Sequence, residues 1–201
     1  MTDETIPTTV AAQITGPEEA AFIARIADVA RLAAVAAPPE LREMLDGARG
    51  VVIDAEVEPW RRAVVAEAES WLRTPWHHNA RIKGVGVDCG NLLIGCFVNA
   101  GLMADFELEP YDHDFMLHRD EEKFLGIVQE HLDEIEGPPQ PGDVALWRYG
   151  RCFSHGAIVV RWPEWIIHAL VIQKQVALDD SRAGWLMTNP VRFFSIENRR
   201  L

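Results

Sequence analysis

The chain has two patterns of hydrophobic and polar positions, a helical one before residues 137–143 and a strand-like one after them. Before this segment, apolar residues recur every three or four positions, a pattern that predicts amphipathic helices over 15–36, 58–73, 90–102 and 121–135. After it, short apolar runs separated by turn residues predict strands at 144–147, 155–160, 165–170, 171–178 and 191–194. Helices followed by an antiparallel meander predict an α+β fold, with the helix at 90–102 lying on the sheet.

Residues 1–54 form a separate part of the pattern. An aperiodic arm precedes a helix that Thr15 would cap, and Pro38-Pro39 ends this helix before a second, short one over 39–46. We expect this N-terminal helical extension to be either a hairpin that packs on the main domain or a docking segment for a larger assembly. Residues 55–201 are expected to form one domain, because a chain of 201 residues is too short for two large ones.

The charge of the chain limits its partners. With 19 Lys and Arg against 31 Asp and Glu, the formal net charge is -12, which argues against binding to nucleic acid or to an anionic membrane surface. The N-terminus lacks a basic-then-apolar signal pattern, and no apolar run is long enough for membrane insertion. Three cysteines without paired CxxC spacing indicate reduced thiols. We therefore expect a soluble protein that is made in a cytoplasm without a signal peptide.

Cys89 is the strongest candidate for chemistry. A glycine-spaced, extended run, Gly84-Val85-Gly86-Val87-Asp88, leads into this cysteine, and an apolar helical pattern begins at the same residue. At a helix N-terminus, the unpaired backbone N–H groups and the positive end of the helix dipole favour thiolate over thiol. The pattern therefore predicts a reactive thiol at Cys89.

Two histidines are candidates for a base and its partner. His155 follows a turn and enters an apolar strand, where a polar ring is costly unless it has a partner. His168 lies within the next apolar run, and adjacent antiparallel strands can place two such rings side by side. His155 would then be the general base and His168 the residue that orients it. By spacing alone, a buried cysteine and two hydrogen-bonded core histidines remain the alternative.

Five motif blocks stand in the same order as in a known family: Thr74-Pro75-Trp76, 86–92, 141–147, 154–159 and Ile167-His168-Ala169. They resemble the NlpC-type, papain-like cell-wall cysteine peptidases, with the greatest similarity to the phage-tail branch. The resemblance covers roughly residues 57–195. It implies a papain-like NlpC-type fold with Cys89 as nucleophile, His155 as general base and His168 as orienting residue, without a cofactor or a metal.

The resemblance also implies a function. Members of the family hydrolyse peptide bonds in the stem peptides of bacterial peptidoglycan. Phage-tail members, and those of gene transfer agents, are carried at the tail hub or tip, where they open the wall locally. We therefore expect a cysteine endopeptidase incorporated in a virion or phage-like tail, with tail-hub or tail-tip proteins as partners and the host cell wall as its place of action. The alternatives are a structural tail-hub protein with little activity and a thiol amidase or acyltransferase acting on another substrate.

Further residues are candidates for binding substrate or the oxyanion. Trp76 stands where the family usually has a tyrosine whose hydroxyl faces the nucleophile, and an indole N–H would donate from a different place. His77 and His78 are either cleft or loop residues, and Asp88 is either a helix cap or a contact to a substrate amine. The set is completed by residues that adjoin the nucleophile and the base, Gly90 and Ser154. None of the histidines has HExxH spacing, so we expect no metal site.

Overall fold

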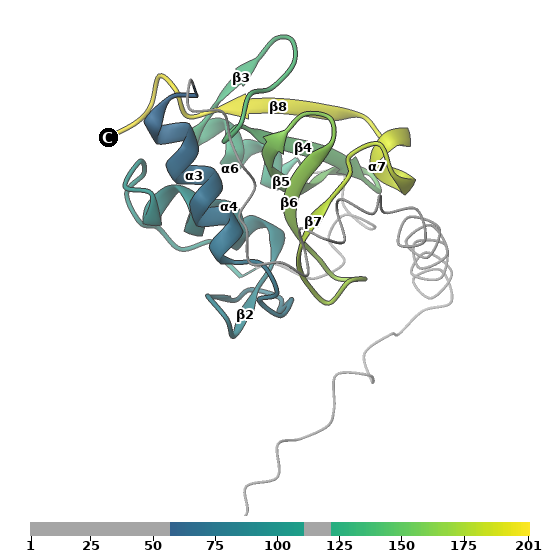
Figure 1. Cartoon of the computed structure of the whole chain (residues 1–201). Helices are drawn as coiled ribbons and strands as arrows, with labels where there is room; N and C mark the ends of the chain where they lie inside the picture. The colour runs from purple at the N-terminus through teal and green to yellow at the C-terminus, as the bar shows by residue number, and fades with distance from the viewer. Residues whose placement is uncertain (1–56, 111–121) are drawn as a thin grey trace, which may run out of the picture.

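The computed structural model describes residues 57–110 and 122–201, in which helices pack on a six-stranded antiparallel sheet (Figure 1). The helices are α3 (Pro59–Ser70), α4 (Cys89–Asn99), α6 (Lys123–His131) and α7 (Gly184–Thr188). The strands are β1 (Arg81–Ile82), β2 (Gly86–Val87), β3 (Asp133–Ile135), β4 (Val144–Tyr149), β5 (Cys152–Arg161), β6 (Trp165–Leu170), β7 (Gln175–Asp179) and β8 (Val191–Ser195). The helices predicted at 15–36 and 39–46, and the boundary at 54/55, lie outside the described residues.

The sheet has the strand order β3-β8-β4-β5-β6-β7, and every neighbouring pair is antiparallel. Strands β4 to β7 form the predicted meander. β8 returns to pair with β4 on the other side, and β3 pairs with β8 at that edge. The predicted α+β class is therefore confirmed, and the helices predicted at 58–73 and 90–102 are present as α3 and α4.

The prediction of one helix over 121–135 is wrong at its C-terminal end. Helix α6 stops at His131, because Leu132 has the extended backbone angles φ -128° and ψ 151°. The next three residues form β3 and pair with Phe193, Phe194 and Ser195 of β8. Hydrogen bonding to a distant strand thus overrides the helical period of the local sequence.

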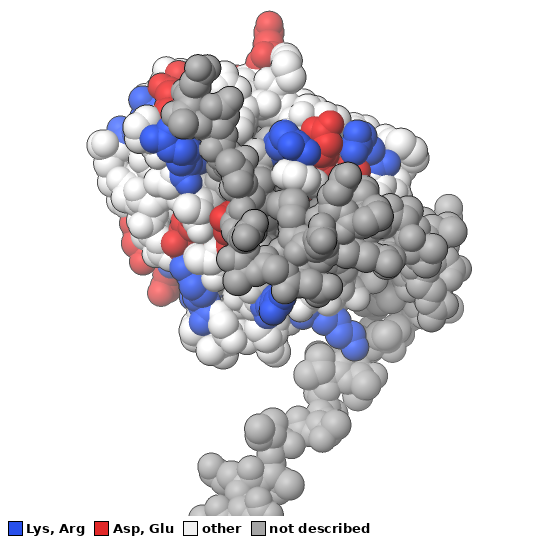
Figure 2. All heavy atoms as spheres, in the orientation of Figure 1, with Lys and Arg blue, Asp and Glu red and all other residues white. Residues whose placement is uncertain are grey.

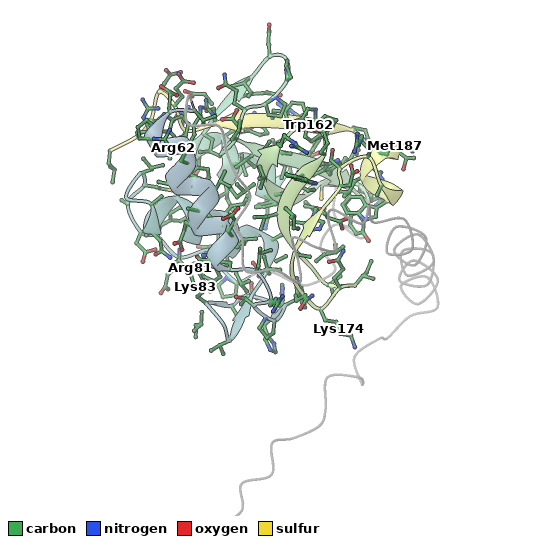
Figure 3. The ribbon with its side chains drawn as sticks, in the orientation of Figure 1. Arg62, Arg81, Lys83, Trp162, Lys174 and Met187 are labelled. Carbon is green, nitrogen blue, oxygen red and sulfur yellow. The ribbon has the colours of Figure 1, made fainter. Side chains whose placement is uncertain are left out.

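Each face of the sheet has its own apolar core. The larger core lies between the sheet and α3, α4 and α6, and the smaller one lies on the opposite face, where Leu186 of α7 is buried against Trp147. Figure 3 labels two residues at this second face: Trp162, whose ring lies 4.8 Å from Phe193 of β8, and Met187, which is exposed. The two cores together hold the central strands rigidly between helices.

Helix α4 approaches β5 closely because Gly156 has no side chain. A Cβ at this position would lie 2.7 Å from Cδ1 of Leu93, a distance that real Cβ contacts essentially never show. Since Leu93 is in the first turn and a half of α4, this contact brings the N-terminal end of the helix against the strand that carries His155. The close approach therefore determines where Cys89 lies.

The surface does not gather charge of one sign on the described part of the face in Figure 2, where Lys and Arg are mixed with Asp and Glu. Several charged side chains form ion pairs between elements, as Arg199 does with Asp133 at 2.6 Å and Lys83 with Glu67 at 2.6 Å. The Lys83 contact joins the β1–β2 hairpin to α3 (Figure 3). Among the helices of residues 57–110 and 122–201, none has the length and apolar character needed to cross a membrane.

Candidate active site

Asp88 determines where helix α4 begins. One carboxylate oxygen accepts hydrogen bonds from the backbone N–H of Asn91 at 2.9 Å and from its side-chain amide at 3.0 Å. The other accepts from the backbone N–H of Asn79 at 2.7 Å, with His78 Nδ1 4.0 Å away. The side chain is 2% exposed. Both oxygens are thus engaged within the protein, which favours the helix cap over the predicted alternative of a contact to substrate.

A β-bulge lies next to His155. Trp147 of β4 pairs with His155 and Arg148 pairs with Phe153, so Ser154 is an extra residue of β5 that has no paired residue on β4. A bulge bends its strand and changes the direction in which nearby side chains point. The Ser154 hydroxyl donates to the carbonyl of Tyr149 at 3.0 Å, and the Ser154 carbonyl accepts from the Cys89 thiol, with 3.8 Å between oxygen and sulfur. Ser154 therefore contacts Cys89 through its backbone.

The sulfur of Cys89 lies against the strand on both sides of His155, near the Ser154 carbonyl and the backbone N–H of Gly156. Although the residue is partly exposed, desolvation at the sulfur raises the pKa of the Cys89 thiol to about 12, and the charge of Asp88 adds to this effect. The N–H groups of Gly156, Gly90 and Cys89 lower the pKa but do not offset the rise. Burial thus outweighs the helix start and shifts the pKa of this thiol upwards, opposite to the direction expected from the helix start alone.

His155 and His168 are in direct contact, as predicted from their strands. Nε2 of His155 lies 2.9 Å from Nδ1 of His168, and the two rings meet edge to face at 76°. His155 is 6% exposed and His168 is fully buried. Burial lowers the pKa of His155 well below its usual value, and the neighbouring His168 lowers it further. A neutral imidazole is available to accept a proton, so the pair is suited to general-base chemistry.

Trp185 of α7 packs against the ring of His155. Its ring meets that of His155 edge to face, with the centroids 5.2 Å apart, and Tyr149 packs on Trp185 at 4.7 Å. The sequence analysis did not single out Trp185, because a five-residue helix is too short to show a period. The imidazole is thus enclosed between an indole and a second histidine.

A carboxylate that the sequence analysis missed extends this arrangement. Oδ2 of Asp179, the last residue of β7, lies 3.4 Å from Nε2 of His168. The contact is within ion-pair reach but does not meet hydrogen-bond geometry, and among the described atoms Nε2 has no hydrogen-bond partner. Burial raises the pKa of Asp179, but His168, the N–H of Asp180 and the amide of Gln173 outweigh burial and lower it overall. The carboxylate is therefore ionised beside the buried ring.

The structure places the remaining candidates around the start of α4. Trp76 is half-buried beside Val87, and its ring stacks on that of His78 at 6.2 Å. His78 is also half-buried, whereas His77 is exposed and bonds through its backbone N–H to Val87. Gly90 lines an apolar pocket between α4 and α6. The other residues of the pocket are Leu93, Ile94, Phe97, Met103, Phe106, Leu108, Phe124, Ile127, Val128, His131 and Leu132.

Cys96 and Cys152 are both buried, and neither they nor Cys89 form a disulfide in this structure. Within the two described ranges, no three His, Cys, Asp or Glu side chains are grouped as a metal ion would require.

Comparison with known proteins finds similarity among solved structures. No family model and no curated protein sequence matches the chain. The NlpC/p60 domain of the peptidoglycan hydrolase SagA aligns at 17% identity and a TM-score of 0.47, over 67% of this chain and 97% of that one. NlpC1 from Trichomonas vaginalis aligns at 17% identity and 0.49, over 71% and 45%. The peptidoglycan hydrolase RipB from Mycobacterium tuberculosis aligns at 14% identity and 0.45, over 92% and 88%.

These structures are what the chain is similar to. Because their TM-scores are below 0.5, we base the function on the geometry of the site and on the motif blocks of the sequence. The α+β arrangement itself, helices on an antiparallel sheet with a cysteine at a helix start, is directly visible in the fold.

Proposed function

We propose that the protein is a cysteine peptidase that hydrolyses peptide bonds in the stem peptides of bacterial peptidoglycan. One observation carries this proposal: helix α4 begins at a thiol that contacts the strand on both sides of His155, and His155 in turn contacts His168. A nucleophile, a base and a residue that orients the base are the three parts that thiol catalysis requires. The substrate class comes from the motif blocks, which resemble cell-wall peptidases.

The protonation states define the first step. Because both the Cys89 thiol and His155 are neutral at rest, His155 takes the thiol proton as the sulfur attacks the scissile carbonyl. The C–S bond forms, the C–N bond breaks, and His155 returns the proton to the leaving amine. Water, deprotonated by the same imidazole, then hydrolyses the thioester and restores the thiol.

Backbone N–H groups at the start of α4 are our candidates for binding the oxyanion. Those of Cys89 and Gly90 already act on the sulfur, since they lower the pKa of its thiol. Such donors require no side chain and remain in place throughout the reaction. In this proposal Trp76 lines the approach to Cys89 together with His78, in place of the tyrosine usual in the family.

We further propose that the protein acts at a phage-like tail hub or tip. Two features support this proposal. The five motif blocks are most similar to the phage-tail branch, and an N-terminal segment precedes the proposed peptidase domain. In this proposal residues 1–54 dock on tail proteins and residues 55–201 form the peptidase domain. Removal of residues 1–54 would then abolish incorporation into tails while leaving cleavage of isolated cell wall unchanged.

The activity is tested by incubating the full chain with purified cell-wall sacculi and identifying released peptides by mass spectrometry. Cys89→Ala removes the nucleophile, and Cys96→Ala, on the same helix but buried in the core, is the matched control. We expect release by the natural protein and by Cys96→Ala only. Equal release by Cys89→Ala would refute thiol catalysis, and no release by the natural protein would favour the structural alternative.

Acyl transfer is a second candidate because of one observation, the apolar pocket that begins at Gly90, next to the nucleophile. An apolar acyl chain held there would reach the same sulfur. Adding an amine acceptor to the reaction distinguishes the two chemistries. A peptidase yields free acid, whereas a transferase yields the acylated amine as the main product.

A further inference from the structure

Three polar side chains form a line across the face of the sheet that carries α7. In the register where Ile158 pairs with Ile167, His168 lies opposite Ala157, two residues from His155. His168 itself pairs with Ala177, two residues from Asp179. Because side chains two residues apart share a face, all three project on the same side and meet diagonally from strand to strand. The line runs through β5, β6 and β7.

The proton positions along this line depend on one another. A neutral imidazole carries one N–H and one acceptor nitrogen, so the short contact between the two rings requires one ring to donate and the other to accept. If Nδ1 of His168 accepts, His155 carries its proton on Nε2 and its Nδ1 is the unprotonated base. If Nδ1 of His168 donates, the proton of His155 is on Nδ1, and that nitrogen cannot accept the thiol proton.

We infer that Asp179 is a positioning residue that selects the productive arrangement. Its carboxylate lies 3.4 Å from Nε2 of His168 and has only acceptor sites, so it favours the tautomer of His168 with the proton on Nε2. His168 then accepts from His155, and Nδ1 of His155 is left as the base. The same carboxylate stabilises the positive charge on the histidine pair after proton transfer. This role rests on the proposed cysteine peptidase function.

The surroundings of Asp179 support this role. Its Oδ1 accepts from the backbone N–H of Asp180 at 2.9 Å and its Oδ2 from the side-chain amide of Gln173 at 2.8 Å. Both contacts hold the carboxylate at the end of β7, with its side chain 18% exposed. His168 is fully buried, so solvent does not provide an alternative acceptor for its Nε2. A buried N–H without any acceptor would be costly.

The kinetic test compares Asp179→Ala with Asp180→Ala. The neighbouring Asp180 has the same charge but pairs with Arg182, so it is the matched control. We expect Asp179→Ala to lower kcat about 10- to 100-fold with KM within about twofold, because a residue that acts through His168 changes the barrier and not the binding of substrate. In a His168→Ala background, Asp179→Ala should have little further effect, because the residue acts through His168. The inference would be overturned if Asp179→Ala lowered kcat as much in the His168→Ala background as in the natural protein. It would also be overturned if Asp179→Ala and Asp180→Ala lowered kcat equally.

A measurement without substrate separates this inference from the proposed function. The ¹⁵N spectra of the histidine rings report which nitrogen carries each proton. In the natural protein we expect the protons on Nε2 of His168 and Nε2 of His155, and in Asp179→Ala a second population with the protons on Nδ1. Protons on Nδ1 in the natural protein would overturn the role of Asp179 even if sacculi are cleaved. Protons on Nε2 without cleavage would instead refute the peptidase.

Discussion

Substitution of Asp88 by alanine would remove three hydrogen bonds from the start of helix α4: one to the backbone of Asn91, one to its side chain and one to the backbone of Asn79. Loss of an N-cap costs about 1 kcal/mol. Asn91 is 7% exposed, so its amide loses an acceptor that water cannot fully replace, which costs about 1–3 kcal/mol. The exposed Asn79 can bond to water instead. We therefore expect Asp88→Ala to lower the free energy of unfolding by about 2–4 kcal/mol.

Asp88→Asn separates the cap from the charge. Asparagine caps helices about as well as aspartate, so its side-chain oxygen can still accept from Asn91. Its amide group would face the backbone N–H of Asn79 as a second donor, and this bond is lost. The expected destabilisation is about 1 kcal/mol. Both variants remove the negative charge that raises the pKa of Cys89, so both should lower that pKa.

Two assays test these expectations. Urea denaturation measures the unfolding free energies, and the pH dependence of alkylation by iodoacetamide measures the pKa of Cys89, with Cys89→Ala to subtract the reaction of other thiols. For a domain of this size the loss in Asp88→Ala corresponds to a fall of about 4–16 °C in Tm. The reasoning is refuted if Asp88→Ala is within about 0.5 kcal/mol of the natural protein, the range of neutral surface changes. It is also refuted if Asp88→Asn leaves the alkylation midpoint unchanged.

Three further predictions concern stability. Folding raises the pKa of the Cys89 thiol from an ordinary 9.0 to about 12. Above pH 9 the unfolded chain therefore loses this proton more readily than the folded protein, and the free energy of unfolding falls as the pH rises. Urea titrations across pH 8–11 should show a smaller fall in the free energy of unfolding for Cys89→Ala than for the natural protein. Gly142→Ala should lower the free energy of unfolding by about 1–3 kcal/mol, because φ is +85° and the new Cβ would lie 3.2 Å from the backbone of Arg61. Gly101→Ala, where φ is +74° but the space around the new Cβ is open, should lower it less in the same denaturation assay. Equal losses in the two variants would contradict a role of the contact with Arg61. Arg61→Met should cost about 3–5 kcal/mol, since it leaves the carboxylate of Asp143 buried without its partner at 2.7 Å, and calorimetry would detect this as a fall in Tm.

Local patterns were sufficient for the elements that carry Cys89, His155 and His168. Asp88 before an apolar helical run predicts a helix start, and α4 begins one residue later. The apolar runs around His155 and His168 predict neighbouring strands, and the pairing of Ile158 with Ile167 confirms it. In each case one side of the element is buried, so its period in the sequence is clear.

Pairing with distant residues determined what the patterns did not predict. The helical period over 121–135 gives no sign that residues 133–135 pair with β8, sixty residues further along the chain. The bulge at Ser154 could not be predicted either. A single extra residue in β5 is recognised only from the pairing of Trp147 and Arg148 on β4 with their partners on β5. Asp179 is visible only as a carboxylate after an apolar run, and its role depends on the register between β6 and β7.

Cys89 shows how the tertiary structure reverses a local signal. The helix start does act as expected, since the N–H groups of Cys89 and Gly90 lower the pKa of the thiol. Desolvation by burial and the charge of the capping Asp88 are larger, however, and the pKa of the thiol is raised overall. The residue that caps the helix thus also suppresses the thiolate. In the proposed peptidase, the nucleophile must therefore be formed during the reaction by His155, so the rate depends on the proton positions in the histidine pair more than on the helix dipole.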